Sequence, residues 1–183
     1  VRYNISQNDH NRGINIAGPV ANSQIYNNTI YVGKGDKVSL LLHSDWEGWA
    51  SGTYLYNNIF YVEGEAEFAS GASRDPDTGH HITAPGFGSS TGNVFDSNLY
   101  FGHLAAAPDA HGRTSDPLLA APGSGGMGRE TLSGYQLQSG SPAADSGKSI
   151  HTQGGNDFFG ARVPACGGMD RGAAEQQTCS AGK

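Results

Sequence analysis

The chain has 183 residues, the length of one domain, and a formal net charge of −6. The acidic balance and the lack of a basic stripe argue against nucleic acids and anionic membranes as partners, and no apolar run approaches membrane length. With 28 glycines, 15% charged residues and no clean 3.6-residue apolar period, the composition favours an all-β chain with many turns over a helical one.

In chain order, short strand patterns alternate with polar turns and loops, and the order of the segments repeats. The predicted segments lie at 1–6, 7–12, 13–17, 24–32, 33–37, 38–42, 43–49 and 53–62. The order is strand, corner, strand, polar turn, strand and return loop. This order predicts three short strands per coil, each pairing with its counterpart one coil away.

A short motif marks each predicted corner and occurs four times, at 1–6, 25–31, 55–61 and 94–100. Each copy has strand-type residues on both sides of an Asn or Asp pair. The corner positions, counted as Asn4, Asn28, Asn58 and Ser97, are 24, 30 and 39 residues apart. Because Asn tolerates the left-handed backbone conformation, it can turn one strand into the next without glycine. We therefore predict that the corners stack and form hydrogen bonds along a column.

These patterns predict a single β-solenoid domain over residues 1–183. It would have about three to four coils over residues 1–101 and a loop-rich closing segment over 102–183, with residues 80–83 as the third strand of one coil. Parallel stacking buries one side chain in two along each strand. The predicted core is Ile25, Ile30, Leu40, Leu42, Leu55, Phe60, Val94 and Leu99.

Four stretches near the C-terminus resemble the closing module of secreted bacterial right-handed parallel β-helix proteins. They read DPLL at 116–119, YQLQSGSPAADSG at 135–147, DFFGAR at 157–162 and GMDRGAAE at 168–175. The early phrase RYNISQND and the Asn corners are similar to the pectate-lyase-like superfamily. Arg171 departs from the Ile usual in that pattern. The resemblance implies a right-handed parallel β-helix, secretion, and polysaccharide lyase or glycoside hydrolase activity.

Both cysteines, Cys166 and Cys179, lie near the C-terminus. In a secreted chain they would form a disulfide, and the Gly-rich flanks favour such a crosslink. The alternative is two free thiols in a cytosolic protein.

The polar turns form a first column of candidate residues, with Asp9, His10, Arg12, Lys34, Asp36 and Lys37 as catalytic candidates and Glu63 and Glu65 beside them. Stacked strands lie about 4.8 Å apart, so carboxylates on adjacent coils can reach the separations that glycosidases use. In a lyase, Arg12 with Lys34 or Lys37 would be the base and neutralise a uronate. Asp9 and Asp36 could hold Ca²⁺. The alternative is that all are solvated turn charges.

The return loop supplies a second column of substrate-binding candidates: His43, Asp45, Trp46, Glu47 and Trp49. Exposed Trp faces stack on sugar rings, and the flanking carboxylates bind hydroxyl groups. The alternative is that both Trp residues cover an open edge of the coil. His80 and His81 are adjacent on a predicted strand and would point to opposite faces, so we predict no metal site there.

The partner expected from these features is a polysaccharide. Val1 lies within a strand pattern and no signal peptide is visible, so we expect a mature, processed or truncated chain. An open first coil would invite pairing, so we expect a second copy of the chain or a preceding segment to cover it, unless that coil frays in water. Two hypotheses remain for function: an extracellular carbohydrate-active enzyme or a fragment of one, and a non-catalytic glycan-binding or structural module.

Overall fold

The computed structural model describes residues 1–9, 11–74, 81–151 and 155–178. The strands and the single 3-10 helix found there are β1 (Ile5–Gln7), β2 (Arg12–Ala17), β3 (Gln24–Tyr26), β4 (Thr29–Val32), β5 (Lys37–Ser44), β6 (Tyr54–Tyr56), β7 (Ile59–Val62), β8 (Glu65–Arg74), β9 (His81–Pro85), β10 (Val94–Asp96), β11 (Leu99–Gly102) and η1 (Arg129–Tyr135). Nowhere in these ranges is there a helix with the length and apolar character needed to cross a lipid bilayer.

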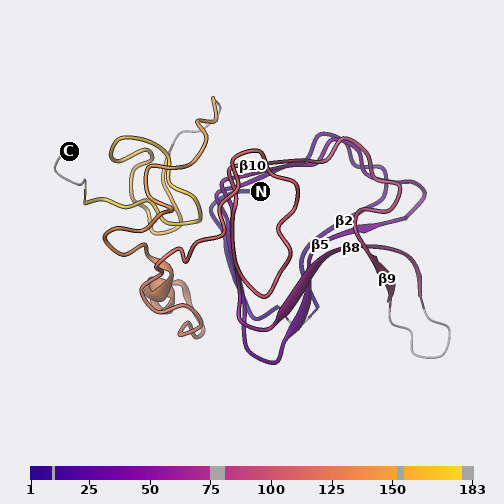
Figure 1. Ribbon diagram of the computed structural model, residues 1–183, viewed down its shortest axis with the longest axis horizontal. Coiled ribbons are helices and arrows are strands. Elements are labelled where there is room, and N and C mark those ends of the chain that lie inside the picture. Colours follow the sequence, from indigo (N-terminus) through magenta and orange to yellow (C-terminus); the bar gives the residue numbers. More distant parts are fainter. Residues whose placement is uncertain (10, 75–80, 152–154, 179–183) are drawn as a thin grey trace.

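The strands form three sheets that run along the stack of coils. Sheet A has the order β10-β6-β3, sheet B β1-β4-β7-β11, and sheet C β2-β5-β8-β9. Strands from successive coils pair in parallel, and Figure 1 shows the coils overlying one another as a three-sided outline. The predicted parallel β-helix of about three to four coils is therefore confirmed.

The core fills the space between the three sheets. In register, Ile25 aligns with Leu55 and then Phe95, and all three are buried. Every predicted core residue is buried except Val94, which is 38% exposed. Since side chains alternate along a strand, the inward position of Phe95 places Val94 on the outer face.

The corners stack as predicted at the first three copies. At the last copy, the residue that joins the stack lies one position later than the predicted one. The first residue of each pair is left-handed, with φ of 50° at Tyr3, 51° at Asn27, 54° at Asn57 and 63° at Ser97. The second residues form the ladder. Nδ2 of Asn4 donates to Oδ1 of Asn28 at 2.9 Å, Asn28 to Asn58 at 3.0 Å, and Asn58 to Asn98 at 2.9 Å. The ladder member of the last copy is therefore Asn98, and Ser97 makes the turn.

Asp109 terminates the ladder. Its Oδ2 accepts bonds from Nδ2 of Asn98 at 2.9 Å, from the Asn98 amide at 3.0 Å and from the Tyr100 hydroxyl at 3.0 Å. A carboxylate suits this position because every Asn of the ladder donates in the same direction, so the last member only has to accept.

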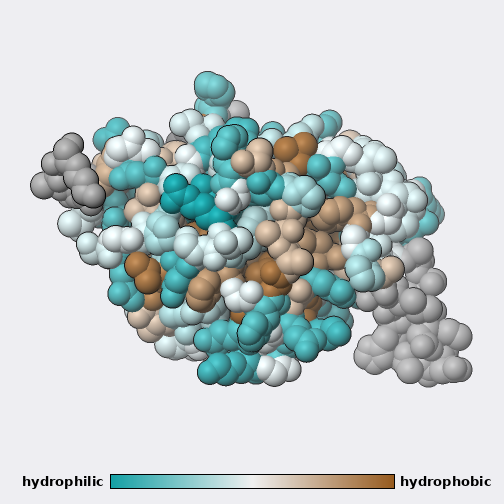
Figure 2. All heavy atoms as spheres, viewed as in Figure 1, coloured by the Kyte–Doolittle hydropathy of each residue, from teal (hydrophilic) through white to brown (hydrophobic). Residues whose placement is uncertain are grey.

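Sheet C ends differently from the prediction. Residues 80–83 were expected to continue the parallel stack, but β9 pairs antiparallel with β8, with Ser70 opposite Ala84. After β11 the chain instead crosses the end of the stack, where Leu104 and Ala107 join the core. In the same view, Figure 2 shows hydrophobic residues gathered over the coils and hydrophilic residues around them.

The closing segment packs along the side of the coils. Its contacts reach from the first coil, where Gln7 bonds Gly125 and Tyr135, to the fourth, where Leu99 lies in the same buried cluster as Tyr135. Figure 1 shows this orange and yellow part of the chain beside the stack. Sheet B is consequently buried on both faces, which explains why β4 and β7 are almost wholly apolar.

Candidate functional site

The predicted catalytic turn residues lie where sheet B passes into sheet C. A depression of about 380 Å³ opens there, lined by Asp36, Lys37, Glu63, Glu65 and His103. Lys37 Nζ lies 3.6 Å from Glu65 Oε2, and both side chains are largely exposed. The structure thus brings together the turn residues of the second and third coils and adds His103, which the sequence analysis missed although it follows β11 at the position where Glu63 follows β7.

The other turn candidates lie apart from this depression. Asp9 accepts a hydrogen bond from Ser6, and Lys34 is exposed on its turn. Arg12 is on β2 opposite Ser39, on the outer face of sheet C. His10 lies outside the described residues. Among those described, no group of three or more His, Cys, Asp or Glu residues is arranged to hold a metal ion.

The return-loop candidates are divided between surface and interior. Trp46 is 70% exposed, and Asp45 and Glu47 beside it are exposed as well. Trp49 is half-buried. His43 was expected on the loop surface but is fully buried, with Nε2 3.4 Å from Thr53 Oγ1, because it ends the inward-facing series of β5. Burial lowers the pKa of His43, so the neutral form is favoured in the interior.

The outer face of sheet A holds a constellation that the repeat pattern did not predict. Because Leu55 points inward, Tyr54 and Tyr56 both face outward, with ring centroids 6.1 Å apart and part of each ring in solvent. In register, Tyr56 aligns with Tyr26 on one side and Asp96 on the other. Across the sheet, Tyr26 and Tyr56 therefore form a row that ends at Asp96, and since Tyr26 is buried, the rings of this row and its neighbours that reach solvent are those of Tyr54 and Tyr56.

Asp96 lies at the centre of a charged cluster. Its Oδ1 is 2.6 Å from His111 Nδ1, and its Oδ2 is 2.7 Å from Lys148 Nζ. Burial raises the pKa of Asp96, but the hydrogen bonds from Lys148 and His111 outweigh this and hold it below its ordinary value. Lys148 Nζ also lies 4.7 Å from the centre of the Tyr56 ring, a cation–π contact that joins the cluster to the tyrosine row.

A depression of about 540 Å³ opens beside this cluster, lined by Asp96, His111, Arg113, Ser146, Lys148 and Arg171. Asp96 comes from the coils, and the other lining residues come from the closing segment, with His111 and Arg113 near its start. Burial and the neighbouring charge of Arg113 lower the pKa of Arg171 to about 10. The site exists only because the closing segment docks against the last coil.

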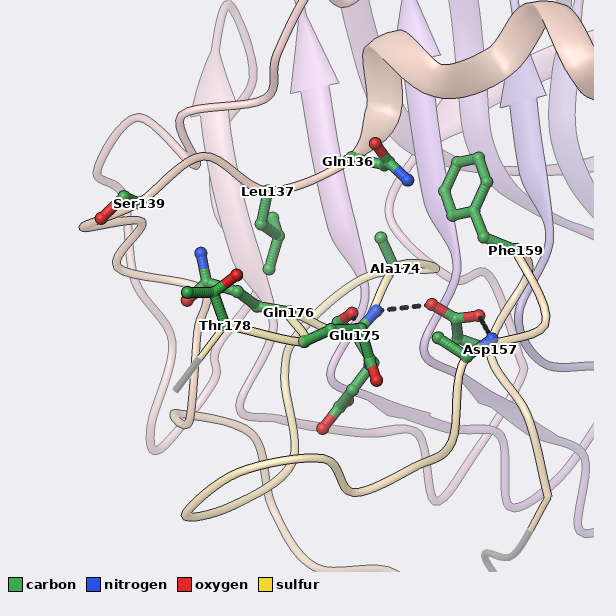
Figure 3. Close-up of a pocket in the computed structure, with 11 residues that line it drawn as sticks. Gln136, Leu137, Ser139, Asp157, Phe159, Ala174, Glu175, Gln176 and Thr178 are labelled. Atoms are coloured by element: carbon green, nitrogen blue, oxygen red, sulfur yellow. Dashed lines mark hydrogen bonds between the residues drawn. The ribbon is translucent and has the colours of Figure 1, made fainter. Parts of the chain in front are cut away.

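A third hollow, of about 330 Å³, lies within the closing segment. Figure 3 shows the Asp157 carboxylate pointing at the amide of Glu175, and this bond is 2.8 Å long. The Glu175 oxygens accept bonds from the amides of Ala165 and Asp170. Burial, followed by the charge of Asp170, raises the pKa of Glu175 to about 7. Since these buried carboxylates bond backbone amides, their role is to fix the segment.

The closing segment also contains Cys166, which is half-buried. Cys179 lies outside the described residues, so the disulfide stays a prediction.

A scan of known protein families found none that matches the chain, and a search among curated proteins returned no relative. The three hollows described above are candidate functional sites. Of these, the depression beside Asp96 at the end of sheet A (the sheet A depression) is lined by accessible charged groups and lies next to the partly exposed ring of Tyr56. The turn depression has charges without an aromatic surface, and the carboxylates at the third hollow are engaged by amides.

Proposed function

We propose that the protein is an extracellular, carbohydrate-active β-helix protein of the pectate-lyase-like type, acting as a polysaccharide lyase or glycoside hydrolase or as part of one. The observation that carries this proposal is the outer face of sheet A, where Tyr54 and Tyr56 lie side by side next to the Asp96 cluster. Tyrosine combines a flat apolar ring with a polar hydroxyl, which suits a sugar ring and its hydroxyl groups.

The two open depressions favour different reactions. Hydrolysis by paired carboxylates requires two acids flanking the bond, and the turn depression offers Asp36, Glu63 and Glu65. Among the described residues that line the sheet A depression, Asp96 is the only carboxylate, and basic groups surround it. That arrangement favours elimination, in which cations neutralise a uronate carboxylate, or binding alone.

A non-catalytic glycan-binding module is the second candidate. The contacts of Asp96 favour this candidate, because each of its two carboxylate oxygens is bound by a cationic or ionisable side chain. Such a carboxylate is less available as a base or nucleophile than a free one. Binding without product formation would distinguish this candidate from an enzyme.

The test is a panel of plant, algal and bacterial polysaccharides, with binding followed by affinity electrophoresis and reaction by ultraviolet absorbance of unsaturated ends and by reducing ends. We expect the affinity of the Tyr54→Ala/Tyr56→Ala double variant to fall about five- to ten-fold, because one or two aromatic contacts with the sugar are lost. Trp46→Ala is the matched control on the other predicted binding surface. Retention of no polysaccharide by the intact protein would contradict the proposal, and a loss confined to Trp46→Ala would move the site to the return loop.

Secretion is tested separately through the cysteines. Intact-mass measurement with and without reductant, after alkylation, should show one disulfide between Cys166 and Cys179. Two alkylated thiols in the untreated protein would contradict both the pairing and secretion.

A further inference from the structure

We infer that the 540 Å³ depression at the end of sheet A is a subsite for an anionic group of a glycan, a carboxylate or a sulfate, held by Lys148, Arg113 and His111. The inference rests on the proposed function for the glycan itself. It adds the class of sugar, acidic rather than neutral, and the residues that select it.

The first support is the balance of charge. Four basic side chains, His111, Arg113, Lys148 and Arg171, line the depression, against one carboxylate, Asp96. The whole chain has a net charge of −6. A local excess of basic groups on an acidic protein attracts an anion to this place and not to the surface in general.

The second support is Arg171, a buried cation with 2% exposure. Its guanidinium donates to the carbonyl oxygens of Asn98 and Ser146 at 2.7 and 3.1 Å. Among the described residues, no carboxylate lies within ion-pairing distance of Arg171 or Arg113. Arg171 is buried, whereas Arg113 is exposed and donates to the carbonyl oxygen of Pro142 at 2.7 Å. Since these two positive charges lie at the depression without a carboxylate partner, they favour an anion there.

The third support is accessibility. The side chains of His111 and Lys148 are 71% and 45% exposed, and Arg113 is exposed as well. Asp96 holds His111 and Lys148 in fixed positions, so little side-chain freedom is lost when an anion binds. The tyrosine row begins immediately beside them, so a sugar ring on Tyr56 would place its acidic substituent over Lys148.

The experiment measures binding of three oligosaccharides of equal length, one neutral, one carboxylated and one sulfated, by calorimetry at two salt concentrations. We expect an acidic ligand to bind at least about ten-fold more tightly than the neutral one, with an affinity that falls as salt rises. Lys148→Gln and Arg113→Gln should each remove most of this preference. Arg162→Gln, which loses the same charge at an exposed position outside this depression, should leave it unchanged.

Several outcomes would decide the matter. If the neutral ligand binds as tightly as the acidic ones and Lys148→Gln has no effect, the anionic subsite is overturned while the glycan-binding proposal stands. If none of the three ligands binds but inorganic sulfate does, the glycan-binding proposal and the anionic subsite for a glycan are both overturned. A preference for the carboxylated over the sulfated ligand, or the reverse, supports the inference and assigns the group. Thermal melts of each variant show whether a loss of binding reflects unfolding.

Discussion

The coils and the closing segment are held together by different means. In the coils, parallel strands pair in register and an Asn column runs through all four corners. The described part of residues 116–178 has one 3-10 helix and a few isolated bridges, and its chain is held by carboxylates that bond backbone amides. A repeated structure is therefore stabilised by repeated bonds, and an irregular one by individual side chains.

The two regions also depend on each other unequally. Each coil stacks on its neighbours through its own backbone, whereas the closing segment needs the outer face of sheet B to bury Leu119, Tyr135 and Ala143. Conversely, without the closing segment Tyr31, Ile59 and Leu99 would face water. We expect the coils to be the more stable region and the closing segment the first to open.

The largest effect is expected in the ladder, from Asn58→Ala. Oδ1 of Asn58 accepts from the amide and Nδ2 of Asn28, and its Nδ2 donates to Asn98, all in the buried interior. Removing these bonds leaves several buried groups unpaired, so the free energy of unfolding should fall by about 3–4 kcal/mol. Urea titration measures the change. Asn4→Ala at the exposed end is the control, and an equal loss there would show that the ladder adds nothing inside the stack.

A smaller and more local effect is expected in the closing segment, from Asp157→Ala. The change removes the acceptors for the amides of Ala161 and Glu175, at 2.7 and 2.8 Å. We expect a loss of about 2 kcal/mol that falls on residues 155–176 and leaves the coils folded. Limited proteolysis should find the new cleavage sites there. Asp157→Asn, which keeps one acceptor, should lose less, and cleavage within the coils would contradict the local character of the change.

The smallest effect is a pH response of opposite sign in the two regions. The raised pKa values of Asp170, about 6, and Glu175, about 7, mean that the stability these groups contribute is present at low pH and is lost as pH rises through these values. The pKa of His43 is lowered, so the coils lose stability as pH falls below its ordinary value of 6.5. Opening free energies from hydrogen exchange should therefore be higher at pH 5 than at pH 8 in the closing segment, and higher at pH 8 than at pH 5 in the coils.

In that experiment, Glu175→Gln should reduce the loss of stability that the closing segment shows as pH rises toward 7. The pH response of the coils should stay unchanged. A response of the same sign in both regions would contradict the assignment of these groups.

The comparison also explains what the sequence could predict. The coils repeat, so the strands, the stacking and most of the core follow from the spacing of Asn and apolar residues. The corner of the last copy was misplaced because Asp96, Ser97 and Asn98 are three consecutive polar residues, and only the ladder geometry selects Asn98. Val94 was misplaced for a related reason: a difference of one residue in register moves a side chain from the inner to the outer face of a sheet.

The sheet A depression was beyond the reach of such patterns. The repeat contained one indication of this site, because it places Asp96 in register with Tyr56. Lys148 and Arg171 come from segments with no periodicity. Lys148 reaches Asp96, 52 residues earlier in the chain, and Arg171 reaches Asn98 only because the closing segment docks on the coils. Polar residues brought together by irregular segments have no spacing rule, so their convergence is visible only in three dimensions.

The most direct test of this account is native-state hydrogen exchange in increasing urea, read for the whole chain. We predict two opening steps. The first, at lower free energy, frees the amides of residues 116–176, while the amides of Asn28 and Asn58 and of strands β4 and β7 stay protected until the second. Exchange of both regions at one common free energy would contradict it, because the closing segment would then be an inseparable part of the stack.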